Sequence, residues 1–436
     1  MTILKANYNY LLLIAPFIGA LIVLYATRFG IGVSPDSTFY ISAADYFYNH
    51  GEVRSIFEGS KWAYMTHYPP GYSIMLSAIK FFTGDIYEAA RWCNAFFMFA
   101  LLFLIGLIVK PYISLLSTFF CQIIILGNVS FFSIYQMAWS EPPYLFFSLL
   151  GLSFFYFYFN ISKTNFLIFY FLVFSIAIIV IYFGISLIAA GAIYLFISQQ
   201  AKTKKKLVSI LIYGVLSSWS ILFWTIRNSI LVDNPTDRHF SYHPVPIEYY
   251  QSWFKTTSEF FTPFTLNDFI FYFLGGSLFL AIITFSILVV KKHTKTIVSA
   301  FTIYSITYLL LLFTSNTFFD DTPIYFRTLS PIYFLLLIGL IVFLLNQHNA
   351  FLRIKTVFFI IWTVFFIKEF NFHVRQIDDG LDYSSRHFKI PETIKAINEL
   401  PVELKIFTNE VDRYYYLSNG RASDWLNDLN IKNEQN

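Results

Sequence analysis

Two carboxylates and one arginine stand out because each lies where a polar motif meets a long apolar stretch. Asp36 lies in the motif Ser-Pro-Asp-Ser, Glu141 in Trp-Ser-Glu-Pro-Pro, and Arg327 in Tyr-Phe-Arg-Thr-Leu-Ser-Pro. A carboxylate can take a proton from a hydroxyl as a general base. A guanidinium can bind a phosphate through two parallel hydrogen bonds. These residue types therefore indicate chemistry on a phosphate-bearing substrate, provided that the fold brings them together.

Each of these residues also has an ordinary structural explanation. A carboxylate such as Asp36 suits the first turn of a helix, and an arginine at a membrane boundary commonly extends toward lipid headgroups. Glu141 is harder to explain, because it is the only Asp, Glu, Lys, Arg or His between Lys110 and Lys163. An isolated ionisable residue at membrane depth is usually functional. The position of Glu141 therefore indicates a functional site.

Further candidates lie in neighbouring motifs. Arg227, in Trp-Thr-Ile-Arg-Asn, is a second candidate for binding a phosphate. His67 lies in Thr-His-Tyr-Pro-Pro-Gly-Tyr, whose prolines are also typical of a simple helix start. Candidate substrate contacts in or beside these motifs are Tyr40, Tyr68, Tyr72, Asn228 and Arg238.

The elements that must position these residues are membrane-spanning helices. Of the 436 residues 57% are hydrophobic and only 13% are charged, whereas roughly a quarter of a soluble domain is charged. Apolar runs of about 20 residues cross a bilayer as helices, because only a helix satisfies its own backbone there. The sequence predicts about eleven spans: 9–28, 88–109, 113–134, 143–160, 164–181, 183–198, 207–226, 268–290, 296–315, 329–345 and 356–370.

The distribution of charge predicts the orientation of these spans. The lysine-rich segments 202–206 and 291–295 fall on the same side as Lys5, which the positive-inside rule makes cytoplasmic. The apolar stretch Gly71–Thr83 is too short to span, so we expect it to lie in the outer interface. The N-terminus is then cytoplasmic, the C-terminus is outside, and all 26 acidic residues fall on or near the outer side.

The expected architecture is therefore an all-α polytopic membrane protein with a small C-terminal α/β extension. Residues 1–370 form the membrane domain, with a long first outer loop at 30–87, and residues 371–436 form the extension. In the extension we expect a helix at 391–400, a strand at 404–408, and a helix at 411–417 that Gly420 ends. The two cysteines, Cys93 and Cys121, lie in predicted spans and have neither disulfide nor metal-site spacing. The net charge of +4 follows from topology and does not indicate nucleic acid.

Carboxylates and arginines thus gather at one membrane–water boundary. A carboxylate that deprotonates a hydroxyl, with cations that stabilise a departing phosphate, could displace a phosphate from a sugar. A flippase or other transporter should instead carry ionisable residues or broken helices at mid-membrane in both halves. A polysaccharide polymerase or ligase should centre on an arginine-rich outer loop, and a scaffold without chemistry leaves Glu141 unexplained.

The order of these motifs resembles the bacterial C-type (GT-C) glycosyltransferases. They run Pro-Asp-Ser-x-x-Tyr, Tyr-Pro-Pro-Gly-Tyr, Ser-Glu-Pro, Trp-x-x-Arg-Asn and Arg-x-Leu-Ser-Pro. The resemblance is nearest to the rhizobial lipopolysaccharide core transferases and more distant to protein O-mannosyltransferases and the lipid A aminoarabinose transferase. It implies an inverting transfer of sugar from a polyprenyl-phosphate donor to a glycan, lipid or protein acceptor outside the cytoplasm, in the inner or plasma membrane.

The resemblance also implies roles for particular residues. Asp36 and Glu141 correspond to catalytic positions, and Arg327 and Arg227 to contacts with the donor phosphate. His67 takes approximately the place of a phosphate-contacting lysine. Relatives often carry an arginine near 182–184, where this chain has Tyr-Phe-Gly. A divalent metal is compatible with the resemblance, but no ligand cluster in the sequence demands one.

Overall fold

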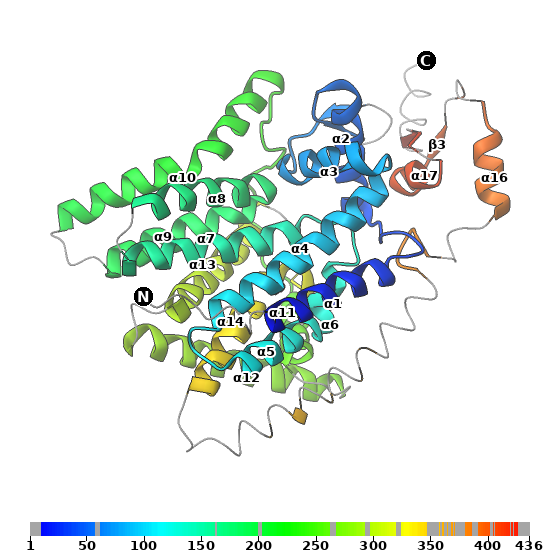
Figure 1. Cartoon of the computed structure of the whole chain (residues 1–436). Helices are drawn as coiled ribbons and strands as arrows, with labels where there is room; N and C mark the ends of the chain where they lie inside the picture. Colours follow the sequence, from blue (N-terminus) through cyan, green and yellow to red (C-terminus); the bar gives the residue numbers. More distant parts are fainter. Residues whose placement is uncertain are drawn as a thin grey trace.

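The computed structural model describes most of the chain. The described residues are 10–56, 62–161, 164–198, 203–261, 267–292, 297–319, 324–346 and 380–385, most of 391–425, and single positions between 357 and 370. This part of the chain is mainly helical, with the long helices packed side by side and the shorter outer elements gathered at one end (Figure 1).

Ten of the eleven predicted spans coincide with helices. These are α1 (Leu11–Ala26), α4 (Ile86–Val109), α5 (Leu115–Leu126) with α6 (Val129–Ile134), α7 (Glu141–Ile161), α8 (Thr164–Val180), α9 (Ile185–Ser198), α10 (Thr203–Leu231), α12 (Asp268–Lys292), α13 (Ile297–Phe318) and α14 (Phe326–Asn346). The eleventh, 356–370, lies mostly outside the described residues. Among those residues, α4, α10 and α13 are long and apolar enough to cross a membrane, and six further apolar helical stretches are shorter.

The helix is interrupted within the predicted span 113–134, which the sequence did not indicate. The structure ends α5 at Leu126 and begins α6 at Val129, with Gly127 and Asn128 between them. The Oδ1 atom of Asn128 accepts from the backbone N–H of Phe131 at 3.0 Å, and its Nδ2 donates to the carbonyl of Phe260 at 2.9 Å. A buried asparagine that caps a new helix replaces the backbone hydrogen bonds lost at the break.

In the described part of the membrane domain, three helices lie outside the predicted spans, on the side that carries the long loops. Helix α2 (Pro35–His50) ends at Gly51, whose φ of +73° favours glycine, and α3 (Gly71–Thr83) has the predicted bounds. Between them β1 (Arg54–Ser55) pairs antiparallel with β2 (Ala63–Tyr64). Helix α11 (Ile247–Phe261) was not predicted, because the sequence indicated only a loop there.

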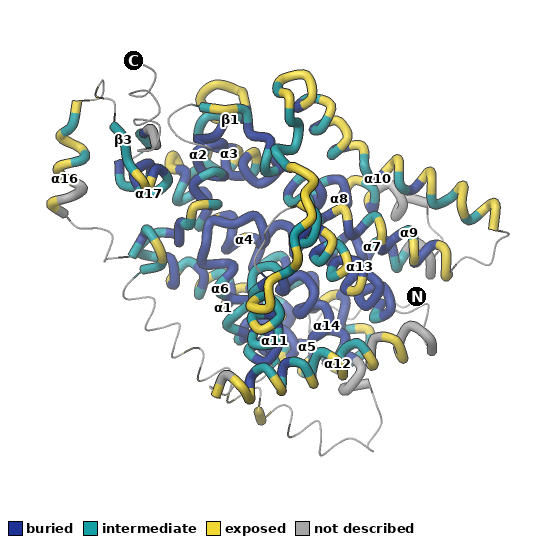
Figure 2. The backbone as a smooth tube through the Cα atoms, turned by 180° about the vertical axis from the view of Figure 1, so that it is seen from behind, coloured by how far each residue is buried: buried dark blue, intermediate teal, exposed yellow. Residues whose placement is uncertain are grey.

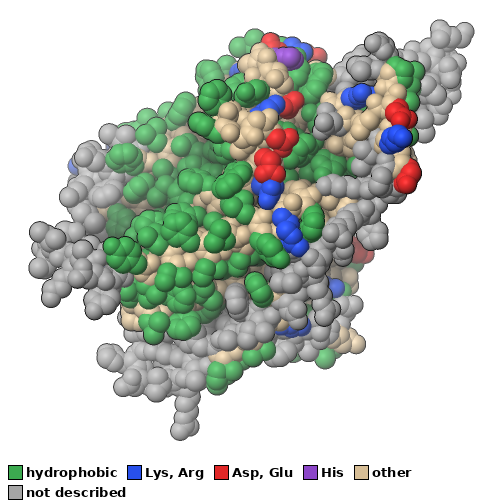
Figure 3. Space-filling model, turned by 45° about the vertical axis from the view of Figure 1, so that its right-hand side comes forward, with side chains coloured by type: hydrophobic (Ala, Val, Ile, Leu, Met, Phe, Trp, Pro, Cys, Tyr) green, Lys and Arg blue, Asp and Glu red, His purple; other side chains and the backbone are tan. Residues whose placement is uncertain are grey.

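The core lies where α4 packs against α1, α3 and α7 (Figure 2). By contrast, α10 exposes apolar side chains such as Leu211, Val215 and Phe223, at 68, 58 and 70%. A contiguous apolar surface of this kind suits contact with lipid. Figure 3 shows hydrophobic side chains over much of one face, with acidic side chains gathered toward the end that carries α2 and α3.

The helix, strand and helix predicted for residues 391–417 occur in that order, and a further strand that was not predicted follows them. The C-terminal extension contains α16 (Pro391–Glu399), β3 (Phe407–Thr408), α17 (Val411–Leu417) and β4 (Asp424–Trp425), with β3 and β4 parallel. Gly420, with a φ of +95°, follows α17 as expected. Helix α17 packs on α2, so the extension rests on the element that carries Asp36.

Candidate active site

Three short segments from distant parts of the chain are joined by isolated β-bridges, Gly32 with Met137 and Val33 with Asp382, next to the site. Gly32 donates to the carbonyl of Gln136 at 2.8 Å, and Ala138 donates to the carbonyl of Gly32 at 2.9 Å. On the other side, Tyr383 donates its backbone N–H to the carbonyl of Val33 at 3.3 Å. The first two segments lead directly into α2 and α7, so their pairing brings the starts of these two helices together.

The same pairing places two carboxylates at neighbouring helix N-termini. Asp36 lies in the first turn of α2, where Ser34 caps the helix and also accepts from Trp139 Nε1 at 2.8 Å. Glu141 is the first residue of α7. Both positions favour a negative charge, because unpaired backbone N–H groups point toward it.

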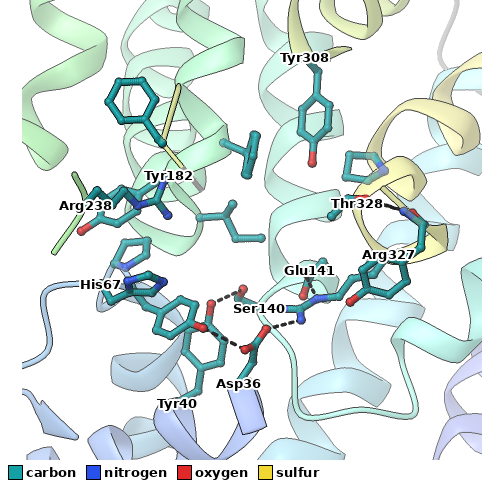
Figure 4. A pocket seen from close by; sticks show the side chains of 17 residues that line it. Asp36, Tyr40, His67, Ser140, Glu141, Tyr182, Arg238, Tyr308, Arg327 and Thr328 are labelled. Atoms are coloured by element: carbon teal, nitrogen blue, oxygen red, sulfur yellow. Dashed lines mark hydrogen bonds and ion pairs between the residues drawn. The ribbon is translucent and has the colours of Figure 1, made fainter. Parts of the chain in front are cut away.

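Arg327 joins the two carboxylates. Its Nε donates to Glu141 Oε1 at 2.5 Å, and its Nη1 donates to Asp36 Oδ2 (Figure 4). Its guanidinium carbon lies 4.4 Å from the centre of the Trp139 ring. A cation at the N-terminal turn of α14 is unfavourable by itself, and the two carboxylates compensate it.

The two carboxylates differ in their remaining contacts. Asp36 Oδ1 accepts from the Tyr68 hydroxyl at 2.9 Å, and 33% of the Asp36 side chain is exposed. The Glu141 side chain is only 9% exposed, and its Oε2 is buried without a hydrogen-bond partner among the described residues. Asp36 is therefore the carboxylate that a ligand can reach.

Two buried phenols complete the acidic side of the site. Burial, with Glu141 as the next cause, raises the pKa of Tyr40 well above its usual value. Burial and then Asp36 do the same to the pKa of Tyr68. Both phenols therefore stay protonated at neutral pH, which leaves the carboxylates as the bases. The Tyr68 hydroxyl donates to Asp36, whereas the Tyr40 hydroxyl accepts from Ser140 Oγ at 3.1 Å.

These residues line one side of a cavity of about 510 Å³. On the opposite side lie His67, Tyr182 and Arg238 (Figure 4). His67 Nδ1 lies 3.6 Å from Asp237 Oδ2, the Arg238 guanidinium lies 5.2 Å from the centre of the Tyr182 ring, and the Tyr182 hydroxyl donates to the carbonyl of Thr66 at 2.8 Å. The cavity thus has one wall on which Arg327 joins two carboxylates, and an opposite wall that carries the Arg238 guanidinium and the His67 imidazole.

A second cavity, of about 290 Å³, adjoins the first. The two share Tyr182, Phe183, Arg238 and Phe319. The rest of its lining is mainly apolar and comes from α9, α10 and α13: Ile185, Ile221, Leu311, Thr314 and Ser315, with Thr236 from the loop after α10. Arg238 therefore stands where a polar cavity meets an apolar one.

Seven of the ten predicted site residues line the larger cavity: Asp36, Tyr40, His67, Tyr68, Glu141, Arg238 and Arg327. The other three lie elsewhere. Tyr72 is fully buried behind Tyr40, with 5.3 Å between the ring centres. Arg227 lies over the rings of Trp224 and Tyr64, at 4.6 and 5.1 Å, and Asn228 is fully buried against the loop that follows α10.

Several lining residues were not predicted. Ser140, Tyr325 and Thr328 lie within the quoted motifs, so the motifs themselves were the signal. Tyr308 lies inside a predicted span and had no signal. The absence of an arginine at 182–184 has a structural counterpart, because Arg238 reaches the face of Tyr182 from a different segment.

Within the described residues, no three His, Cys, Asp or Glu side chains are grouped so that they could hold a metal ion. The two carboxylates that could contribute to such a group are instead joined by the Arg327 guanidinium. The donor set therefore fits charge compensation by arginine better than by a divalent ion.

No protein-family model matches the chain, and no curated protein matches its sequence. Solved structures do match. ArnT from Cupriavidus metallidurans, bound to undecaprenyl phosphate, aligns with a TM-score of 0.59 and 9% identity over 95% of this chain and 86% of ArnT. AglB from Archaeoglobus fulgidus, an oligosaccharyltransferase in complex with an inhibitory peptide and a dolichol-phosphate, aligns with a TM-score of 0.55 and 12% identity over 96% of this chain and 64% of AglB. The apo form of the A. fulgidus oligosaccharyltransferase gives a TM-score of 0.58 at 11% identity, with 96% and 64% covered. The chain therefore has the GT-C fold of these membrane glycosyltransferases.

Proposed function

We propose that this protein is an inverting glycosyltransferase that moves a sugar from a polyprenyl-phosphate donor to an acceptor on the outer face of the cytoplasmic membrane. The observation that carries the proposal is the cavity in which Asp36, Glu141 and Arg327 face Arg238 and His67, with an apolar cavity adjoining it. A donor with a charged head and a long apolar tail matches this pair of cavities. The fold shared with ArnT, which was solved with undecaprenyl phosphate, supports the same donor class.

In the proposed reaction Asp36 is the general base. It takes the proton of an acceptor hydroxyl while the hydroxyl oxygen bonds to the anomeric carbon of the sugar. The bond between that carbon and the phosphate oxygen breaks, and its electron pair leaves on the polyprenyl phosphate. One displacement from the opposite face inverts the anomeric configuration.

The cations act on the phosphate and on the carboxylates. Arg238 and His67, on the wall that borders the apolar cavity, are placed to stabilise the phosphate as negative charge develops on it. Arg327 was expected to contact the donor phosphate. Its contacts assign it first to fixing Asp36 and Glu141 relative to each other, so that Asp36 is held ready for the acceptor.

The proposed acceptor is a hydroxyl group of a surface glycan, a lipid or a protein. Mass spectrometry of lipids and glycans from a strain that lacks the gene tests the proposal. We expect a polyprenyl-phosphate sugar to accumulate and one sugar to be missing from an envelope glycan or glycoprotein. Expression of the wild-type gene should restore the parental profile. Lipid and glycan profiles identical to those of the parent strain would argue against the proposed function.

A further inference from the structure

The turn at residues 234–239, between α10 and α11, brings Arg238 to the junction of the two cavities. Asn234 organises this turn, because its Oδ1 accepts from the N–H of Thr236 and its carbonyl accepts from the N–H of Asp237, both at 3.4 Å. Asp237 has a φ of +51°, a left-handed conformation that aspartate tolerates better than most residues. The direction in which Arg238 points therefore depends on this turn keeping its shape.

The turn is fastened to the end of α10 by Asn228. The Nδ2 atom of Asn228 donates to the carbonyl of Pro235 at 2.8 Å, and the side chain is fully buried. Its Oδ1 accepts from Arg227 Nη1 at 2.8 Å. Arg227 is held in turn over the rings of Trp224 and Tyr64. The amide of Asn228 thus connects a fixed guanidinium on one side with the turn on the other.

The turn also touches the first outer loop through Asp237 and His67, 3.6 Å apart. Because Asp237 and Arg238 are adjacent, a shift of the turn moves the partner of His67 and the guanidinium together. Arg238 and the carboxylate partner of His67 consequently depend on the position of one turn.

We infer that Arg227 and Asn228 are positioning residues for the donor phosphate, which act through Arg238 rather than by contact with substrate. This inference rests on the proposed function and deepens it. The hydrogen bond from Asn228 fixes the position of the turn. The turn then fixes the position at which the Arg238 guanidinium contacts the anionic head of the lipid donor. The pair therefore controls affinity for the lipid phosphate and leaves the base, Asp36, in place.

The variant Asn228→Asp tests this with little change in shape. The aspartate keeps an oxygen that can accept from Arg227. It removes the N–H group that donates to the Pro235 carbonyl and places a carboxylate oxygen next to that carbonyl, which is repulsive. The probe is undecaprenyl phosphate bound to the purified protein in nanodiscs, measured with the rate of sugar transfer. We expect the Kd of the lipid and the donor KM to rise about tenfold, as for a lost buried hydrogen bond. Because Arg238 is also placed to stabilise the charge that develops on the phosphate, we expect kcat to fall as well, whereas the acceptor KM should stay within about twofold of the wild type.

A double-mutant cycle separates positioning from a general loss of stability. If Asn228 acts through Arg238, Asn228→Asp should weaken lipid binding by less than about twofold in an Arg238→Gln background, because coupled residues are not additive. Ser229→Ala, on the same helix, is the matched control, since Ser229 is exposed and its hydroxyl donates to the carbonyl of Thr225 within α10. If Asn228→Asp does not fold, Asn228→Ala replaces it in the cycle, because it removes the same donor without adding charge.

Additive effects in the cycle, or a rise in acceptor KM with unchanged lipid binding, would overturn the inference. Failure of the proposed function looks different. In that case the wild-type protein binds undecaprenyl phosphate and shows the coupling but transfers no sugar, so the inference stands without the glycosyltransferase assignment.

Discussion

At the scale of single residues, the site separates its two carboxylates by what they can reach. Asp36 contacts Arg327 and Tyr68 and is one-third exposed, whereas Glu141 is almost fully buried and contacts Arg327 through one oxygen. A base must come within hydrogen-bond distance of the proton that it removes. In the reaction that we propose, this geometry favours Asp36 as the base and Glu141 as a supporting electrostatic group.

Asp36→Asn should abolish sugar transfer while the protein still folds. The amide has nearly the shape of the carboxylate but cannot accept a proton, and loss of a general base lowers rates by about 10²- to 10⁴-fold. Transfer is measured with purified protein and a polyprenyl-phosphate sugar, and Glu141→Gln serves as the comparison, with a smaller expected loss. Transfer at the wild-type rate by the Asp36→Asn variant would remove Asp36 from the mechanism.

Arg327→Lys should also lower transfer, even though the charge is kept. A lysine presents one ammonium group and cannot join Glu141 and Asp36 through a planar fork. We expect a fall in kcat of about tenfold or more, because each charge-assisted hydrogen bond is worth about 1.5–3 kcal/mol. Addition of a chelator to the wild-type enzyme should leave the rate unchanged, since the guanidinium already compensates the carboxylates. An unaltered kcat in the lysine variant would contradict this role.

The sequence predicted which residues form the site better than it predicted the role of each residue. Asp36, Glu141 and Arg327 could be found because charge is rare in this chain and each lies at the edge of an apolar stretch. Arg227 lies at the edge of an apolar stretch, as Arg327 does, yet it packs on Trp224 and Tyr64 outside the cavity. Sequence spacing cannot tell a guanidinium that faces a cavity from one that faces its neighbours, because both lie at the end of an apolar helix.

At the scale of elements, the paired segments before α2 and α7 set the distance between the two carboxylates. Gly32 lies in the middle of this pairing, and a Cβ atom there would come within 2.2 Å of Met137 Sδ and 3.0 Å of the Gln136 carbonyl oxygen. A side chain at residue 32 would force the Met137 side chain to move and would press against the Gln136 backbone. The position therefore favours glycine because two segments approach closely there, and not because of an unusual φ.

Gly32→Ala should lower both stability and transfer, although residue 32 touches no substrate. Separation of the two segments displaces Asp36 from Glu141, and overpacking of this kind costs about 1–3 kcal/mol. Gly214→Ala is the matched control, because a Cβ there meets nothing within 4 Å and alanine favours a helix over glycine. Thermal unfolding in detergent and the transfer rate measure the two effects. Identical behaviour of the two variants would show that the pairing of 32 with 136–138 does not position the site.

The failure to predict helix α11 and the break between α5 and α6 has a common cause. Helix α11 is short, mixes polar and apolar residues, and follows a loop, so hydropathy did not separate it from the loop. The break at Gly127–Asn128 lies within an apolar run, where the hydropathy is the same whether or not the helix continues. In contrast α17 ends before Gly420, a glycine with positive φ, and the sequence predicted that end from the glycine. A glycine that ends a helix was thus a clearer signal than hydropathy at these positions.

At the scale of the whole molecule, the proposal depends on which helices cross the membrane. Helix α3 decides whether the number of spans between Asp36 and the basic segment at 202–206 is odd or even. Helix α3 has 13 residues, about 20 Å at 1.5 Å per residue, against a hydrocarbon core of about 30 Å. It packs on α2 and α4, and Lys80 near its end pairs with Asp45 of α2. These contacts favour an interfacial helix that packs against α2.

Labelling of single cysteines tests this arrangement. His50 at the end of α2 and Lys204 at the start of α10 are both exposed, and the native Cys93 and Cys121 are buried, so they give little background. A membrane-impermeant maleimide should label the His50→Cys variant in intact spheroplasts. It should label the Lys204→Cys variant only after permeabilisation, because an odd number of predicted spans separates the two positions. If α3 spans the bilayer, that number becomes even and both variants are labelled from the same side. The basic segment at 202–206 would then share a compartment with Asp36, and the outward-facing site that we propose would lose its support from charge.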